Sequence, residues 1–162
     1  MARAPADGMC SDRSVLRDVS ESEEGWTAPV VGFSVVEVRF GGQAYVTAYG
    51  QRADDEQEAP NTTISLPSDF DFVDQTGAEH ALNGEASWES LTPLLSLRHD
   101  RIASAVADRR GWLVVLFDSG AKLEVRPNGQ FENWQLMGPN GVLIVGLPTG
   151  GEPAVWGAVT DT

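Results

Sequence analysis

Residues 112–145, "WLVVLFDSGAKLEVRPNGQFENWQLMGPNGVLIV", determine most of what can be predicted about the fold. Trp112–Phe117 is apolar on both faces, which is typical of a central strand with protein on each side. A turn at Asp118–Gly120 leads into residues 122–126, where apolar and charged residues alternate. Alternation with a period of two predicts a strand with one buried and one exposed face. Gly138–Gly141 is placed at the tip of a further hairpin, so the segment predicts an antiparallel meander.

The same order of features occurs earlier in the chain, in "AYVTAYGQ…TTISLPSDFDFVDQTGAEHAL". This segment follows a hairpin that we expect to turn at Gly41-Gly42. Each segment has two strands, a proline (Pro67 or Pro127), a Phe-acid pair, a glycine turn and a return strand. The two segments are either copies of one unit or two independent meanders of similar pattern, and the first carries an additional acidic loop.

Between the two meanders the apolar period changes. In residues 86–97, "ASWESLTPLLSL", the residues Trp88, Leu91 and Leu94/Leu95 recur at spacings of three and four, which predicts one face of a helix. Pro93 limits the regular part of this helix. The predicted fold class is therefore α+β and mostly β: two antiparallel β-meander units, with an internal pseudo-repeat as one interpretation, joined by one short helix and packed as a sandwich or half-barrel.

The chain of 162 residues is long enough for one domain. Residues 1–25 are polar and lack a sustained apolar period, so we expect a mobile acidic tail, followed by a single β-rich domain over residues 26–162. Cys10 is the lone cysteine, and the first 26 residues lack the apolar core of a signal peptide. These features favour a cytoplasmic protein.

The net charge of −13 is unevenly distributed. Residues 26–97 contain eleven acidic and only two basic side chains. Such a field repels phosphate backbones and anionic lipid, which argues against nucleic-acid and membrane partners and permits a basic protein partner. The residues that we expect to contact this partner are Asp54, Asp55, Glu56, Glu58, Asp69, Asp71 and Asp74.

A second hypothesis places an apolar small molecule in an aromatic pocket, where it is bound or transformed. Its lining would be His80, Trp112, Glu132 and Trp134. A desolvated Glu132 would have a raised pKa and act as an acid or base, whereas a Glu132 paired with Arg110 or Arg126 would only be structural.

The search for catalytic chemistry is mostly negative. His80 and His99 have no second ligand at metal spacing, and the sequence contains no phosphate-binding loop or nucleophile motif. We therefore expect no metal and no cofactor. A non-catalytic binding protein is favoured over an enzyme, and the oligomeric state is left open.

The second meander also carries a family resemblance. The pattern Gly111, Leu113, Phe117, Gly120, Leu123, Val125, Pro127 is followed by Phe131-Glu132-Asn133-Trp134, Pro148-Thr149-Gly150-Gly151 and Ala154-Val155-Trp156. Over residues 29–157 this resembles an uncharacterised actinobacterial family of small proteins, domain-of-unknown-function family 6188. Thr149 departs from its simpler Pro-Gly-Gly turn. The resemblance implies no activity, cofactor or catalytic residue, and its general look is similar to that of small bacterial immunity proteins.

Overall fold

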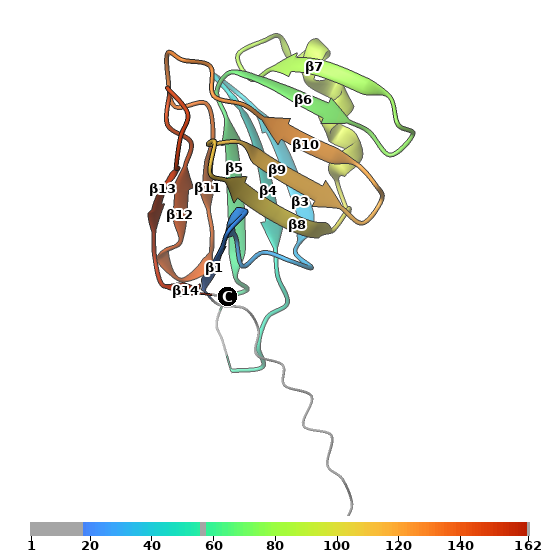
Figure 1. Cartoon of the computed structure of the whole chain (residues 1–162). Coiled ribbons are helices and arrows are strands. Elements are labelled where there is room, and N and C mark those ends of the chain that lie inside the picture. Colours follow the sequence, from blue (N-terminus) through green and yellow to red (C-terminus); the bar gives the residue numbers. More distant parts are fainter. Residues whose placement is uncertain (1–17, 56–57, 162) are drawn as a thin grey trace, which may run out of the picture.

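Two β-sheets packed face to face make up most of the molecule (Figure 1). The computed structural model describes residues 18–55 and 58–161. Within these ranges the chain has fourteen strands, a single α-helical segment and two short 3₁₀ helices. The prediction of a mostly β, α+β fold is confirmed, and the two layers form a sandwich.

The smaller sheet has six strands in the order β13-β12-β11-β5-β4-β3, and all neighbours are antiparallel. The strands are β3 (Ser34–Phe40), β4 (Ala44–Tyr49), β5 (Asn61–Leu66), β11 (Gln135–Met137), β12 (Leu143–Val145) and β13 (Ala154–Trp156).

The larger sheet has eight strands in the order β14-β1-β2-β8-β9-β10-β6-β7. Its neighbours are antiparallel except for β1 and β14, which are parallel. The strands are β1 (Val19–Ser22), β2 (Gly25–Thr27), β6 (Asp69–Val73), β7 (Glu79–Asn83), β8 (Ile102–Asp108), β9 (Leu113–Phe117), β10 (Lys122–Val125) and β14 (Val159–Asp161).

The two predicted meanders occupy equivalent positions, but each is divided between the sheets. Strands β3-β4-β5 lie in the smaller sheet and the chain then crosses to β6-β7 in the larger one. Strands β8-β9-β10 lie in the larger sheet and the chain crosses back to β11-β12. The crossings fall at Pro67 and Pro127, which cannot donate a backbone hydrogen bond to a sheet ladder. In each sheet, a strand of one half pairs with a strand of the other: β5 with β11 in the smaller sheet and β10 with β6 in the larger one.

The predicted helix is shorter than expected, and only part of its predicted face is turned inward. Only α1 (Trp88–Leu91) is α-helical, and it continues into the 3₁₀ helix η1 (Thr92–Leu97), in which Pro93 lies at the first turn. The buried residues are Leu91, Leu94 and Leu97, at the three-residue spacing of a 3₁₀ helix. Trp88 was predicted on the buried face, but its side chain is 62% exposed.

Regular structure is already present before the predicted boundary at residue 26. Strand β1 pairs with β2 and with β14, and Val19 is fully buried. Arg109 holds this corner, because its guanidinium donates to the carbonyl oxygens of Ser22 and Glu23 and pairs with Glu21. Residues 18–25 are therefore part of the domain. The preceding part of the expected tail lies outside the described residues.

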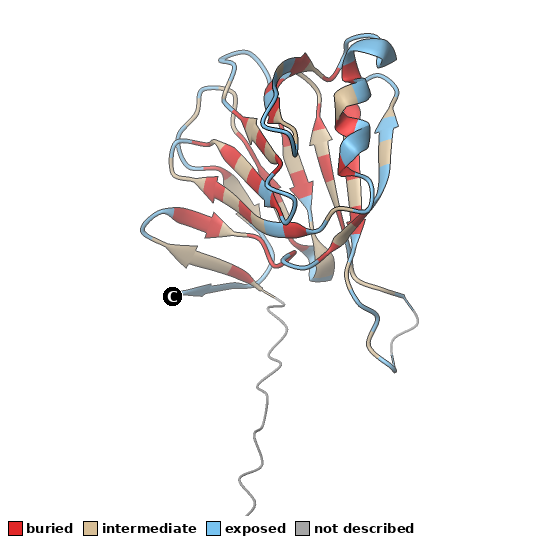
Figure 2. Ribbon diagram, turned by 90° about the vertical axis from the view of Figure 1, so that its right-hand side faces the viewer, coloured by how far each residue is buried: buried red, intermediate tan, exposed pale blue. Residues whose placement is uncertain are grey.

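The inward faces of both sheets form one core, shown by the buried residues in Figure 2. Val46 and Ile64 of the smaller sheet, and Val115 and Leu123 of the larger sheet, are at most 1% exposed. The alternation that buries these residues leaves the residues between them on the outer faces of the sheets.

Candidate functional site

A groove lies on the outer face of the larger sheet, over β10, β6 and β7. It consists of two adjoining hollows with volumes of about 620 and 460 Å³, which share Asp71, Ala81, Glu124 and Arg126. Asp71 and Ala81 are register partners on β6 and β7. The alanine leaves room above the sheet that a larger side chain would fill. We call the joined hollows the sheet groove. Its ionisable lining consists of Asp69, Asp71, Glu79, His80, Lys122, Glu124 and Arg126.

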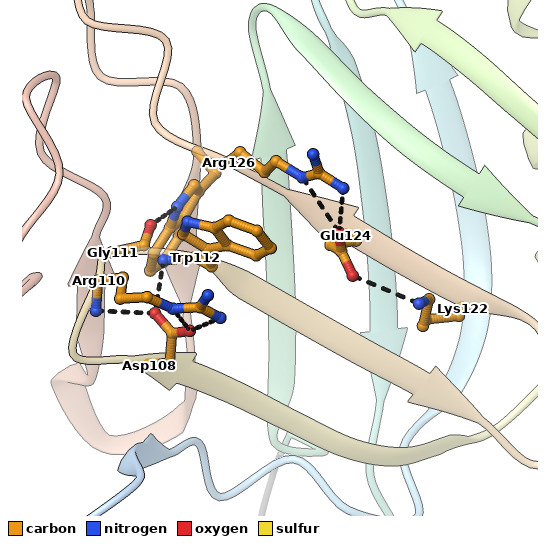
Figure 3. Close-up of polar contacts among 8 residues, drawn as sticks. Asp108, Arg110, Gly111, Trp112, Lys122, Glu124 and Arg126 are labelled. Atoms are coloured by element: carbon orange, nitrogen blue, oxygen red, sulfur yellow. Dashed lines mark hydrogen bonds and ion pairs between the residues drawn. The ribbon is translucent and has the colours of Figure 1, made fainter.

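Two carboxylates lie directly opposite each other on the groove floor, because Glu124 of β10 is the register partner of Asp71 of β6. Arg126 lies 2.9 Å from Glu124 and 3.8 Å from Asp71, measured from its Nη2 to the nearer carboxylate oxygen. Lys122 Nζ lies 3.3 Å from the other oxygen of Glu124. Like charges facing each other across a strand pair are destabilising, so these two cations compensate for the arrangement. Figure 3 shows both cations at the Glu124 carboxylate.

Glu124 stays ionised in this setting. Its partial burial acts to raise its pKa, but hydrogen bonds from Arg126 and Lys122 and their positive charges outweigh burial and hold the pKa below the ordinary value. A carboxylate held ionised in this way is poorly suited to exchange protons near neutral pH.

Trp112 lies on the outer side of the larger sheet, where its ring contacts Arg126, a lining residue of the groove. Its ring is covered on both sides by guanidinium groups, with Arg110 at 3.9 Å and Arg126 at 4.7 Å from the ring centroid (Figure 3). Asp108 fixes this stack, because it accepts hydrogen bonds from the backbone N–H of Trp112 and from the Arg110 side chain. Residues 112–117 were expected to form a central strand with protein on each side, but β9 begins at Leu113, and Trp112, which precedes it, is only half-buried.

The acidic residues expected to contact a partner do not form one surface. Asp54, Asp55 and Glu58 are exposed in the loop between β4 and β5, and Glu56 lies outside the described residues. Figure 1 shows this loop at one end of the molecule, with β6 and β7 toward the other. Asp69 and Asp71 line the sheet groove, so only part of the expected set lies at the groove.

The carboxylate of Asp74 is engaged in hydrogen bonds within the β6–β7 turn. Its carboxylate accepts hydrogen bonds from the backbone N–H groups of Thr76 and Ala78 and from the Thr76 hydroxyl, and it lies 3.0 Å from His80 Nε2. The hydrogen bond with His80, followed by those from Thr76, holds the pKa of Asp74 well below its ordinary value. Asp74 therefore stabilises the turn.

The four residues of the alternative aromatic pocket do not converge. Trp134 is fully buried (0% exposed) and donates through Nε1 to the carbonyl oxygen of Gly111 at 3.0 Å. Trp112 is on the outer face, and His80 stacks against Phe72 beside the turn. Glu132 is exposed and accepts a hydrogen bond from the side chain of Gln135.

Sequence reasoning missed the groove residues of β10. The alternation of residues 122–126 already placed Lys122, Glu124 and Arg126 on an outer face. Their proximity to Asp69 and Asp71 depends on the pairing of β10 with β6, which no local signal predicts.

Within residues 18–55 and 58–161, no three histidine, cysteine, aspartate or glutamate side chains are grouped closely enough to hold a metal ion. None of the helices in the same ranges has the length and apolar character needed to cross a bilayer.

The fold and the groove together define a class of protein: a two-sheet β-sandwich whose larger sheet presents a charged, grooved outer face. The chain belongs to a family of unknown function, DUF6188, whose model matches residues 26–157. Neither the curated proteins nor the solved structures compared with the chain include a match.

Proposed function

We propose that the protein is a non-catalytic binding protein whose sheet groove receives a basic segment of a protein partner. The observation that carries the proposal is the charge of the groove, which has four carboxylates against two cations. Both cations are engaged by Glu124, while Asp69, Asp71 and Glu79 are exposed. An arginine or lysine of a partner would find carboxylate acceptors there.

The surrounding chain extends this negative potential. No lysine or arginine occurs from residue 53 to residue 97, a stretch that includes β6, β7 and α1. A surface of one sign accelerates encounter with a partner of the opposite sign, and the effect falls with ionic strength. A role of the immunity type, in which an acidic protein occludes a basic partner, would use this end of the molecule.

The ion pairs on the groove floor favour recognition over catalysis. A general acid or base works best with a pKa near the operating pH, whereas the pKa of Glu124 is lowered by its partners. Glu124 is thus suited to hold a fixed negative charge on the groove floor.

The proposal is tested by titrating the isotopically labelled protein with a peptide of alternating arginine and glycine, followed by NMR. We expect the amide shifts to cluster on β6, β7 and β10, and the affinity to fall as salt is added. A peptide with glutamine in place of arginine serves as the ligand control.

Two double variants locate the contact, because they make the same charge change at opposite ends of the molecule. Asp69→Asn with Asp71→Asn should weaken peptide binding several-fold at low salt. Asp54→Asn with Asp55→Asn should weaken it much less, since those residues lie in the β4–β5 loop. Equal losses in both variants would show a diffuse field in place of a groove and would refute the proposal.

A further inference from the structure

The outer face of the smaller sheet differs in charge from the rest of the molecule. Strands β4, β5, β11, β12 and β13 are adjacent and contain no aspartate, glutamate, lysine or arginine. Only the edge strand β3 is charged, through Glu37 and Arg39, which lie 3.9 Å apart. In a chain of net charge −13, five adjacent strands without a charge mark a distinct surface.

The register of the strands places the most exposed apolar groups in one row. Met137 of β11 pairs with Leu143 of β12, and Leu143 pairs with Trp156 of β13. Met137 and Trp156 are each 53% exposed. In the other direction the row continues through Thr63 and Thr47, whose hydroxyl oxygens lie 3.3 Å apart. We call the outward side chains of β4, β5, β11, β12 and β13 the uncharged face.

The composition of the uncharged face is that of a protein interface. Interface cores are enriched in tryptophan, tyrosine and methionine and depleted in charged residues, and the face carries Trp156, Met137 and the exposed Tyr49. A basic partner would find no carboxylate on these five strands, and a nucleic acid only Arg39, which reaches from β3 over the Tyr45 ring and lies 3.9 Å from Glu37. The chemistry of the face therefore requires an occupant that is itself uncharged where it binds.

We propose that the uncharged face binds the same face of a second copy of this chain, forming a two-fold symmetric dimer. Two copies of a chain with net charge −13 repel each other over their acidic surfaces, and the uncharged face is where they can approach without facing carboxylates. A two-fold axis also matches the apolar row of one copy with that of the other, as an isologous interface requires. An antiparallel arrangement keeps the two acidic β4–β5 loops at opposite ends.

The size of the face sets the strength of this dimer. Strands of three to six residues, at about 3.3 Å per residue and about 4.8 Å between strands, give a projected area of about 350 Å² per copy. Because side chains project from the sheet, the accessible area is larger than the projected area. The accessible area buried by both copies together is therefore near the lower limit of about 1,000 Å² for specific interfaces. We therefore expect a dissociation constant for the dimer on the order of tens to hundreds of micromolar.

The test is sedimentation equilibrium of the full chain at low and at high salt. The protein concentration is varied from about 5 to about 500 µM, a range that brackets the expected dissociation constant. The mass should rise from 17.4 kDa toward twice that value. Added salt should strengthen association, because it screens the repulsion between copies, whereas it weakens binding of a basic peptide to the sheet groove. The two interactions are thereby distinguished.

Single substitutions test whether the uncharged face is the dimer interface. Met137→Lys and Met137→Glu should each raise the dissociation constant at least tenfold, because a charge of either sign must be desolvated when the faces meet. A purely electrostatic effect would instead let the lysine strengthen association. Leu116→Lys is the matched control, since Leu116 is an exposed apolar residue on the outer face of the other sheet. Wild-type protein that stays at 17.4 kDa throughout, dimers that persist in both Met137 variants, or equal loss in Leu116→Lys would each overturn the proposal.

Discussion

Replacing Trp134 and Trp112 by alanine, one at a time, separates the inside of the sandwich from its outer face. Trp134 is completely buried, and its removal leaves a large cavity and an unpaired carbonyl oxygen at Gly111. Truncation of a buried tryptophan costs about 3–5 kcal/mol, and the lost hydrogen bond keeps the value at the upper end. At this chain length about 2–4 °C are lost per kcal/mol, so the melting temperature should fall by at least about 10 °C.

Trp112→Ala should cost much less. The ring is half-buried and its main contacts are the two stacked guanidinium groups, each worth about 0.5–1 kcal/mol at an exposed site. The two contacts together give about 1–2 kcal/mol, and with the lost partial burial we expect about 2–3 kcal/mol in total. The free energy of unfolding is best measured by urea titration followed by circular dichroism, because the other tryptophans complicate fluorescence.

A third variant, Trp134→Phe, serves as an internal control for this comparison. Trp134→Phe retains most of the buried volume but lacks the N–H donor, so it should lie between the wild type and Trp134→Ala. Equal costs for the two alanine variants, or a larger cost for Trp112→Ala, would contradict the assignment of the two rings to opposite sides of the larger sheet.

Three further changes test other parts of the fold. Removing residues 1–25 deletes β1, so it should lower the melting temperature by several degrees more than removing residues 1–17, and equal effects would show that β1 contributes nothing. Gly146→Ala should destabilise strongly, because its Cβ would lie 2.2 Å from the indole nitrogen of the buried tryptophan, whereas Gly41→Ala adds a Cβ in open space and serves as the control in thermal melts. Asp74 has a folded-state pKa below its unfolded value near 3.8, so its stabilisation is fully present above that value and is lost progressively as the pH falls from there toward the folded-state pKa. Asp74→Asn should therefore flatten the decline of the melting temperature between about pH 5 and pH 2, and an unchanged decline would contradict this.

The hairpins could be predicted from the sequence because their signals are local. Gly41-Gly42 and Gly138–Gly141 mark turns between strands that are neighbours both in sequence and in space. The facing of Trp112 could not be predicted in the same way. The strand that follows it, β9, is apolar on both sides, so alternation does not show which side chains enter the core. The polar strand β1 gave no signal either, because three of its four residues are serine or glutamate and its position depends on contacts with Arg109.

The candidate site was predicted only in part, again because the sequence carries local signals and not contacts between distant strands. Asp69 and Asp71 were identified because they belong to the acidic stretch of residues 26–97. The loop acids and the groove acids were grouped because they are close in sequence, and the fold separates them by the length of β5. The role of Lys122 and Arg126 follows only from the contact between the two halves of the chain.

The division of each half between the two sheets has a consequence for synthesis of the chain. The central strand β5 pairs Ile64 with Leu136, seventy-two residues later, so its edge is complete only when the second half has emerged from the ribosome. At about 5–20 residues per second, this edge waits for about 4–14 seconds with its backbone groups unpaired. The first half cannot complete its own sheet meanwhile, so the nascent chain has high contact order and no early stopping point. Slowing translation just before residue 134 would therefore lengthen the period in which an open strand edge is available for aggregation or for a chaperone.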